Sequence, residues 1–144
     1  MFVFDTDHLG ILQRKNEPEL SRIRERMSKY ASDSFFVSIV SFQEQAAGWI
    51  SHVRHAKSQR EVVFGYAMLR NVLADFAALQ VLDYDESASR TYISLKKQCV
   101  RVGAMDLKIA AVVMTHGMTL LTRNTVDFER VPALRFEDWT LPIK

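Results

Sequence analysis

The chain contains 144 residues, of which 48% are hydrophobic and 25% are charged, and its formal net charge is +2. This length and composition are typical of one compact globular domain with its own core, so we expect residues 1–144 to form a single domain. The nearly balanced charge excludes any argument for nucleic-acid binding that rests on overall charge alone.

The sequence indicates neither a secretory signal nor a membrane span. The chain starts directly with a strand-like run over 1–4, and no apolar stretch approaches the ~20 residues that a transmembrane helix needs. The single cysteine, Cys99, excludes an internal disulfide, and we expect it to be a small buried hydrophobic residue. Both features fit a cytoplasmic protein in a reducing compartment.

Apolar periodicity divides the chain into short strands that alternate with helices. In the first half of the chain, this periodicity predicts a strand over 1–4, a helix over 7–13, a helix that Asn16 caps and that reaches about Tyr30, a strand over 35–39, and helices over 41–55 and 58–77. In the second half, it predicts a strand over 79–82, helices over 86–98 and 106–116, a strand over 119–122, a turn of helix over 126–130 and a strand over 134–136. The predicted buried stripe of the helix over 58–77 consists of Val62, Tyr66, Leu69, Leu73 and Phe76.

This order of elements predicts an α/β fold. Strands that alternate with helices form parallel sheets through right-handed crossovers. We therefore expect a central, mostly parallel sheet of about five strands with helices on both faces. The two consecutive helices over 41–77 insert an αα-hairpin into that plan.

Four acidic residues each stand where an apolar run ends or a helix begins: Asp5, Glu44, Asp106 and Asp127. In an open parallel α/β sheet, functional groups gather beyond the carboxyl ends of the strands. We therefore expect these four carboxylates to converge, although they lie far apart in the sequence. Carboxylates that gather without a basic partner indicate a hard, oxygen-ligated cation such as Mg²⁺ or Mn²⁺. Such a site predicts metal-assisted phosphodiester chemistry.

Each of the four acids also has a purely structural interpretation. The alternatives are a capping box of Ser41 with Glu44, a helix start at Asn124 that includes the fourth acid, a favourable charge at a helix N-terminus for Asp106, and a turn at Asp5. Both interpretations stay open, because a helix N-terminus also orients a carboxylate and keeps it ionised.

The run Phe-Val-Phe-Asp-Thr-Asp over 2–7 admits a different class of enzyme. It resembles the D-x-D opening of haloacid-dehalogenase-like phosphatases, which implies Asp5 as the nucleophile and Asp7 as the acid/base. The chain departs from that family at Leu9, where Thr or Val is usual, and it lacks a downstream paired-Asp motif. This phosphatase is the alternative function.

Three segments carry more specific signatures. Segment 4–9 reads Phe-Asp-Thr-Asp-His-Leu, segment 101–111 contains the pattern G-x-x-D-x-x-I-A-A, and segment 122–139 contains T-x-N, D-F, V-P-x-L and E-D-W in that order. Together they resemble the PIN domains, specifically those of VapC-type toxins, over nearly the whole chain. The chain departs from that pattern at Asp7, where Asn is common, and at Ala133, where Gly is usual. The change at Asp7 adds a fifth acid or caps the first helix.

The resemblance implies a PIN-like three-layer fold and a Mg²⁺- or Mn²⁺-dependent endoribonuclease toxin. Its acidic quartet, which would hold the metal and catalyse hydrolysis, matches Asp5, Glu44, Asp106 and Asp127, and its supporting polar positions match Thr6, Thr122 and Asn124. Since Asn124 stands at a position that is acidic in some relatives, the fourth site position lies with either Asn124 or Asp127.

The resemblance also implies partners. These are a structured RNA such as tRNA or ribosomal RNA, a cognate antitoxin that silences the toxin, and a second copy of the chain in a homodimer. Arg123 is the predicted contact to an RNA phosphate, and the basic stretch 52–60 is the next candidate. A third class, a non-catalytic antitoxin-binding regulator, is disfavoured because the acidic quartet is intact.

Overall fold

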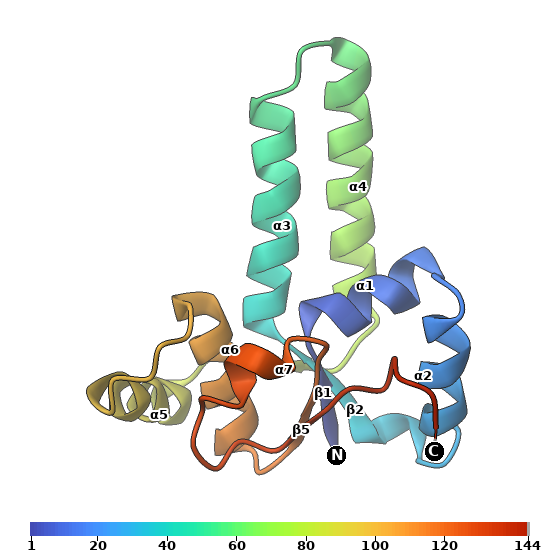
Figure 1. The fold of residues 1–144 in the computed structure, drawn as a ribbon. Helices are drawn as coiled ribbons and strands as arrows, with labels where there is room; N and C mark the ends of the chain where they lie inside the picture. Colours follow the sequence, from blue (N-terminus) through green and yellow to red (C-terminus); the bar gives the residue numbers. More distant parts are fainter. Residues whose placement is uncertain (144) are drawn as a thin grey trace.

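The computed structural model describes residues 1–143 and is built on a five-stranded sheet with the strand order β3-β2-β1-β4-β5. Every pair of neighbouring strands runs parallel, so the predicted α/β fold is confirmed (Figure 1). The strands are β1 (Phe2–Phe4), β2 (Phe35–Ser38), β3 (Val81–Leu82), β4 (Thr119–Leu121) and β5 (Phe136–Glu137).

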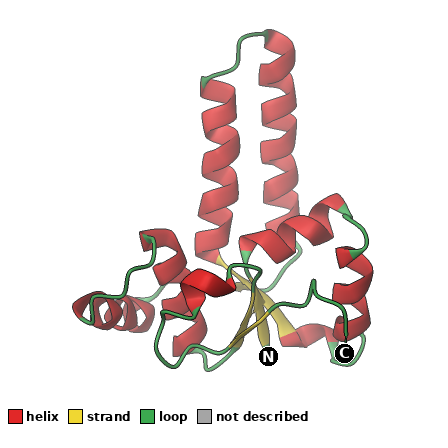
Figure 2. Cartoon of the chain, viewed as in Figure 1, coloured by secondary structure: helices red, strands yellow, loops and turns green. Residues whose placement is uncertain are grey.

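Helices flank the sheet on both sides (Figure 2). They are α1 (Thr6–Arg14), α2 (Glu19–Met27), α3 (Ile39–Arg54), α4 (Gln59–Ala77), α5 (Glu86–Lys97), α6 (Ala104–Thr115) and α7 (Thr125–Phe128), with a short 3-10 helix, η1 (Ser32–Ser34), before β2. The predicted αα-hairpin is α3 and α4, which project side by side away from the sheet (Figure 1). None of the helices in residues 1–143 is long and apolar enough to cross a membrane.

The alternation of side chains along each strand produces two hydrophobic cores, one on each face of the sheet. In β1, Val3 points into the core formed with α5, α6 and α7, whereas Phe2 and Phe4 point into the core formed with α1, α2 and α4. In β4, Leu120 and Leu121 divide in the same way. Because both faces are covered, the strands are continuous apolar runs, as expected for a buried parallel sheet. The result is the predicted three-layer architecture.

Three predicted helix starts are displaced by two residues, and one of them is that of α6, which begins at Ala104 and not at 106. Helix α2 begins at Glu19, and the carboxylate of Glu17, not the side chain of Asn16, accepts a hydrogen bond from the Ser21 amide at 3.1 Å. Helix α3 begins at Ile39 with Ser38 as its cap, two residues before the predicted start. Position 41 therefore lies inside the helix, and the capping box with Glu44 does not form.

The predicted buried stripe of α4 is only partly correct. Phe76 is buried, but Tyr66 and Leu73 are 59% and 57% exposed. The buried positions of this helix are Gly65, Val72 and Phe76. Periodicity identified the helix but not its buried face, because most of α4 packs only against α3 in a hairpin that stands away from the body (Figure 1).

Cys99 is exposed, so its prediction as a buried residue is wrong. It lies after the end of α5 with a backbone φ of 57°, in the left-handed region. Its amide donates to the carbonyl of Lys96 at 3.0 Å and thereby closes the last turn of the helix. A residue in this terminating position points away from the core.

Close packing between α3 and α4 predicts opposite effects for two glycines. A Cβ at Gly65 would lie 2.6 Å from Cγ2 of Val53 and 2.8 Å from Cδ2 of His52, whereas a Cβ at Gly48 would meet nothing within 4 Å. We expect Gly65→Ala to lower the free energy of unfolding by about 1–3 kcal/mol through overpacking. Gly48→Ala, the matched control, should raise it by about 0.5–1 kcal/mol through helix propensity. Urea unfolding measures both, and two equal effects would contradict the close contact.

Candidate metal and nuclease site

The predicted acidic residues converge where the strand order changes direction. Strands β1 and β4 are neighbours, and from β1 the chain continues to β2 on its other side. Such a switch point leaves a crevice at the carboxyl ends of the strands. Asp5 follows β1 directly, and Thr122 follows β4 directly. The amide of Asp5 donates to the carbonyl of Leu121 at 2.9 Å, which extends the pairing of the two strands up to the site.

Asp5 is the most buried acid of the site, with a relative exposure of 6%. One carboxylate oxygen accepts from the amide of Thr6 at 2.8 Å, and so caps α1, while the other accepts from the hydroxyl of Thr122 at 2.8 Å. Burial, followed by the charge of Asp7, raises the pKa of Asp5 to about 7 against the lowering effect of both hydrogen bonds; Asp106 raises it further. The structure thus holds a carboxylate where its charge is poorly compensated.

Glu44 comes from α3, and its side chain reaches α1. The hydroxyl of Thr6 donates to Glu44 Oε1 at 3.2 Å. Burial raises the pKa of Glu44, the bond from Thr6 lowers it, and the charge of Asp106 raises it. The predicted supporting role of Thr6 therefore has a structural basis, since its amide and its hydroxyl each hold one acid of the predicted quartet.

Asn124 lies between the other two acids. Its side-chain amide donates to Asp127 Oδ2 at 3.0 Å and lies 3.5 Å from Asp106 Oδ2. Although Asn124 stands at the N-cap position of α7, its side chain makes no capping hydrogen bond. Burial raises the pKa of Asp106, and the charges of Asp127 and Asp7 raise it further. Because this amide is neutral and lies between two carboxylates, it reduces their repulsion without adding a charge to the site.

The structure places a fifth acid, Asp7, beside the other four. Its Oδ1 is 2.8 Å from Nδ1 of His8, and its Oδ2 accepts from the amide of Arg123 at 2.9 Å. Burial by itself would raise the pKa of Asp7, but the bonds from His8 and the Arg123 amide outweigh it and leave the pKa lowered. The motifs of the sequence assign no polar role to His8. Its adjacency to Asp7 is the only signal for that role in the sequence.

The chemistry of the donors suits a hard divalent cation. All five acids present oxygen, and among the ion pairs within residues 1–143 none neutralises Asp5, Glu44 or Asp106. Arg130 lies 3.7 Å from Asp127, whose side chain is 38% exposed. In the same part of the chain, no three His, Cys, Asp or Glu side chains form a ready-made ligand cluster. Mg²⁺ usually keeps several waters and takes only one or two carboxylates, so this looser arrangement fits it.

Arg123 and the basic stretch 52–60 are placed differently around the site. Arg123 is exposed at its rim, and its backbone amide binds Asp7 while its side chain extends outward. The stretch 52–60 forms the tip of the α3–α4 hairpin, far from the ends of β1 and β4 (Figure 1). Arg123 is therefore the cation better placed to meet an anion bound by the acids.

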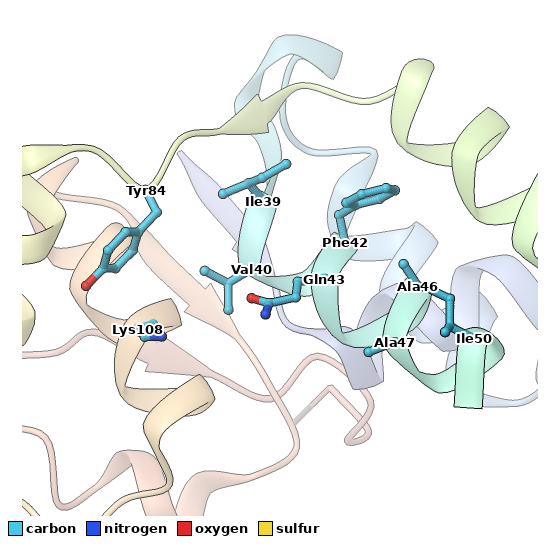
Figure 3. A pocket seen from close by; sticks show the side chains of 9 residues that line it. All are labelled: Ile39, Val40, Phe42, Gln43, Ala46, Ala47, Ile50, Tyr84 and Lys108. Atoms are coloured by element: carbon cyan, nitrogen blue, oxygen red, sulfur yellow. The ribbon is translucent and has the colours of Figure 1, made fainter. Parts of the chain in front are cut away.

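An apolar hollow lies beside the acidic site without including any of its acids. It is lined by Ile39, Val40, Phe42, Gln43, Ala46, Ala47, Ile50, Tyr84 and Lys108, which come from α3, the segment after β3, and α6 (Figure 3). Val40 and Ala47 lie four residues before and three residues after Glu44 on α3, on the same face of the helix, so the hollow adjoins the site at Glu44. Its mostly apolar lining suits the side chains of a protein and does not suit phosphate.

Known proteins resemble this chain over nearly its whole length. The model of the PIN domain family matches residues 3–134. The tRNA(fMet)-specific endonuclease VapC of Salmonella typhimurium is 30% identical over 142 residues, covering 96% of this chain and 97% of that protein. Ribonuclease VapC1 of Haemophilus influenzae is 28% identical, covering 97% of this chain and 98% of that protein.

Solved structures give the same result. The DNA-bound VapBC complex from Salmonella typhimurium contains a chain that matches with a TM-score of 0.73 and 26% identity, over 96% of this chain and 97% of that one. VapBC-1 from nontypeable Haemophilus influenzae matches with a TM-score of 0.75 and 25% identity, over 97% and 98%. The chain therefore belongs to the PIN domain family and, within it, to the VapC ribonuclease toxins.

The geometry of Asp7 also bears on the phosphatase alternative. An acid/base residue has to exchange a proton with substrate, but both oxygens of Asp7 accept hydrogen bonds from neighbouring groups of the protein, and its pKa is lowered. The match to the PIN family over 3–134 leaves the resemblance to haloacid-dehalogenase-like phosphatases without support.

The raised pKa of Asp5 predicts a pH-dependent gain from Asp5→Asn. The pKa of Asp5 rises from 3.8 in the unfolded chain to about 7 in the folded one. Protonation of this carboxyl therefore contributes stability that is fully present below about pH 4 and is lost as the pH rises through 7. Asparagine does not titrate and still caps α1. With chelator present, the variant should therefore gain on the order of 2–4 kcal/mol over wild type between pH 4 and pH 8.

Urea unfolding at the two pH values measures this difference. Asp33→Asn is the matched control, because Asp33 is an exposed acid that precedes β2 and so lies at the opposite edge of the sheet. Asp33→Asn removes an acid outside the site, so at pH 8 it should stabilise the protein less than Asp5→Asn does. A stability difference from wild type that does not change with pH for Asp5→Asn would show that Asp5 is not held in a desolvated, negatively charged setting.

Proposed function

We propose that this protein is a Mg²⁺- or Mn²⁺-dependent endoribonuclease that hydrolyses phosphodiester bonds of RNA and acts as the toxin of a toxin–antitoxin pair. The observation that carries the proposal is the convergence of Asp5, Glu44, Asp106 and Asp127 at one sheet edge, with Asp5 buried and its pKa raised to about 7. A cation that binds only the folded chain would offset the cost in stability of gathering these repelling charges. The names of the relatives support RNA as the substrate.

The proposed division of labour follows from burial and hydrogen bonding. Asp5 is the deepest acid and is oriented by Thr6 and Thr122, so it is the central ligand. Glu44 and Asp106 approach from α3 and α6 as the other principal ligands. When bound, Mg²⁺ lowers the pKa of an attacking water, holds the phosphate and stabilises the leaving oxygen.

Asp127 completes the site from α7, and its side chain is 38% exposed. The side-chain amide of Asn124 donates to Oδ2 of Asp127 at 3.0 Å. The other carboxylate oxygen of Asp127, Oδ1, takes no part in this bond. We propose that Asp127 fills the fourth acidic position and orients the attacking water, while Asn124 supports it. Arg123, at the rim, attracts a phosphate of the RNA into the site.

Two protein partners are part of the proposal. Solved relatives are VapBC complexes, which supports a cognate antitoxin for this chain. A homodimer is supported by exposed apolar residues on the projecting hairpin, which a monomer would leave in water; they are Ile39, Ile50, Val63, Phe64, Tyr66 and Leu73. The non-catalytic alternative keeps the same partners and differs only in lacking turnover.

Replacing one acid tests the metal site by activity and by stability together. Asp106→Asn should reduce RNA cleavage more than about 100-fold, since loss of an outer-shell partner alone costs about 10- to 100-fold. In EDTA the variant should melt above wild type, because repulsion from Asp127 and Asp7 is relieved. Added Mg²⁺ should raise the melting temperature of wild type but hardly that of the variant.

The exposed Asp33, at the other edge of the sheet, again provides the control. Asp33→Asn should cleave RNA and respond to Mg²⁺ as wild type does. Undiminished cleavage by wild type in excess EDTA would rule out the metal mechanism. A folded wild-type protein that cleaves no RNA with Mg²⁺ or Mn²⁺ would favour the non-catalytic regulator.

Arg123→Ala tests the RNA approach. Its backbone amide still binds Asp7, so the variant should fold normally and lose only the side-chain contact. We expect weaker RNA binding and a logarithmic salt slope reduced by about one unit. The exposed Arg24, on α2, is the control and should leave the slope unchanged when replaced by alanine. An unchanged slope for Arg123→Ala would transfer the role to the stretch 52–60.

A further inference from the structure

His8 is a fully buried polar residue between the acidic site and the C-terminal segment. Its Nε2 lies 3.1 Å from the backbone nitrogen of Trp139, and its Nδ1 lies 2.8 Å from Asp7 Oδ1. A backbone N–H can only donate, so Nε2 must accept and carries no proton. The single ring proton therefore sits on Nδ1 and is donated to Asp7.

Within residues 1–143, no other hydrogen bond to Nε2 of His8 is formed. Oδ1 of Asp138 is 3.7 Å away, beyond hydrogen-bond distance, and already accepts from the amide and hydroxyl of Thr140 at 2.9 and 2.6 Å. Trp139 is itself held in place, because its ring packs against Phe2 with a centroid separation of 4.8 Å. The acceptor role of Nε2 is thus set by rigid backbone and not by a mobile side chain.

The other oxygen of Asp7 holds the loop that leads into the second half of the site. Oδ2 accepts from the Arg123 amide at 2.9 Å and lies 3.3 Å from the Thr122 hydroxyl. That hydroxyl has one proton, which goes to the nearer Asp5, at 2.8 Å, and its oxygen accepts from the amide of Asn124 at 3.0 Å. Asn124 in turn contacts Asp106 and Asp127.

We propose that Asp7 and His8 are a positioning pair, which couples segment 138–140 to the acidic site by fixing the backbone of residues 122–124. The catalytic consequence of this pair rests on the proposed nuclease function. In this role, Asp7 is neither a metal ligand nor an RNA contact. Its functional effect reaches the acids through Thr122 and Asn124.

The hydrogen-bond donors explain why an aspartate suits position 7 of this chain. The side chain faces two donors, Nδ1–H of His8 and N–H of Arg123. A carboxylate offers an acceptor to each of them, whereas an asparagine offers one acceptor and one NH₂ group. In Asp7→Asn, the side-chain NH₂ group would therefore face one of these two N–H donors. This clash of donors is removed when residue 8 no longer donates to residue 7.

Nuclear magnetic resonance of imidazole-¹⁵N-labelled protein tests the geometry without reference to activity. We expect His8 to show a protonated Nδ1 and an unprotonated Nε2 in the wild type, and Asp7→Asn to shift both the His8 ring signals and the Arg123 amide. His116, whose Nδ1 lies 2.9 Å from the Val112 carbonyl on α6, is the internal control and should not shift. A proton on Nε2 of His8, or an Arg123 amide that does not respond, would overturn the proposal.

A double-mutant cycle tests the consequence for the site. Asp7→Asn should lower kcat by 10-fold or more, with KM for RNA within about 2-fold of wild type. In the His8→Gln background, where the glutamine oxygen can accept from the Trp139 amide and the fixed Nδ1–H donor is gone, the same change should lower kcat less than 3-fold. Equal losses in both backgrounds, or loss of the Mg²⁺-induced rise in melting temperature as in Asp106→Asn, would make Asp7 a ligand and overturn the proposal.

The same cycle read by melting temperature separates this proposal from the proposed function. The Asp7→Asn penalty should again shrink in the His8→Gln background, whether or not the protein cleaves RNA. If wild type cleaves no RNA but the melting temperatures are non-additive in this way, the positioning pair stands and the nuclease assignment fails. Additive melting temperatures in variants that fold would overturn the pair, even if wild type is an active nuclease.

Discussion

Repulsion among five carboxylates at one sheet edge is the constraint around which the rest of the structure is arranged. Asp5 is buried and the other four acids are only partly exposed, so their charges are screened less than they would be at the surface. Neutral donors hold the acids apart and in place: the hydroxyls of Thr6 and Thr122 and the amide of Asn124. Because these donors carry no full charge, they orient the carboxylates and leave them free to bind a cation.

The rigidity required for this arrangement comes from the two cores. Strands β1 and β4 bury their side chains on both faces, so their ends, where Asp5 and Thr122 stand, have little freedom to separate under repulsion. The C-terminal segment adds a second restraint through the bond from Trp139 to His8. The site thus combines fixed ligands from the sheet with ligands from helices α3, α6 and α7.

The two kinds of surface near the site differ in chemistry. The acids and Arg123 form a polar edge that suits an RNA phosphate with a metal ion, whereas the hollow along α3 and the exposed side of α4 are apolar and suit protein. The proposed function requires both kinds of surface, since it pairs an RNA substrate with protein partners. Because the polar edge and the apolar hollow lie close together, a protein bound in the hollow could block the access of RNA to the acids.

Local sequence determined the elements and the candidate acids. The periods of strands and helices, and the position of an acid at a strand end, can be recognised from residues that are neighbours in the sequence. These patterns predicted the parallel sheet. They also predicted that Asp5, Glu44, Asp106 and Asp127 meet at one edge of it. The tertiary structure decided which face of α4 is buried, because that depends on how far the hairpin stands from the body. It also decided the partners of Glu44, Asn124 and His8, since Thr6, Asp106 and Trp139 are distant in sequence and meet them only after the sheet has formed.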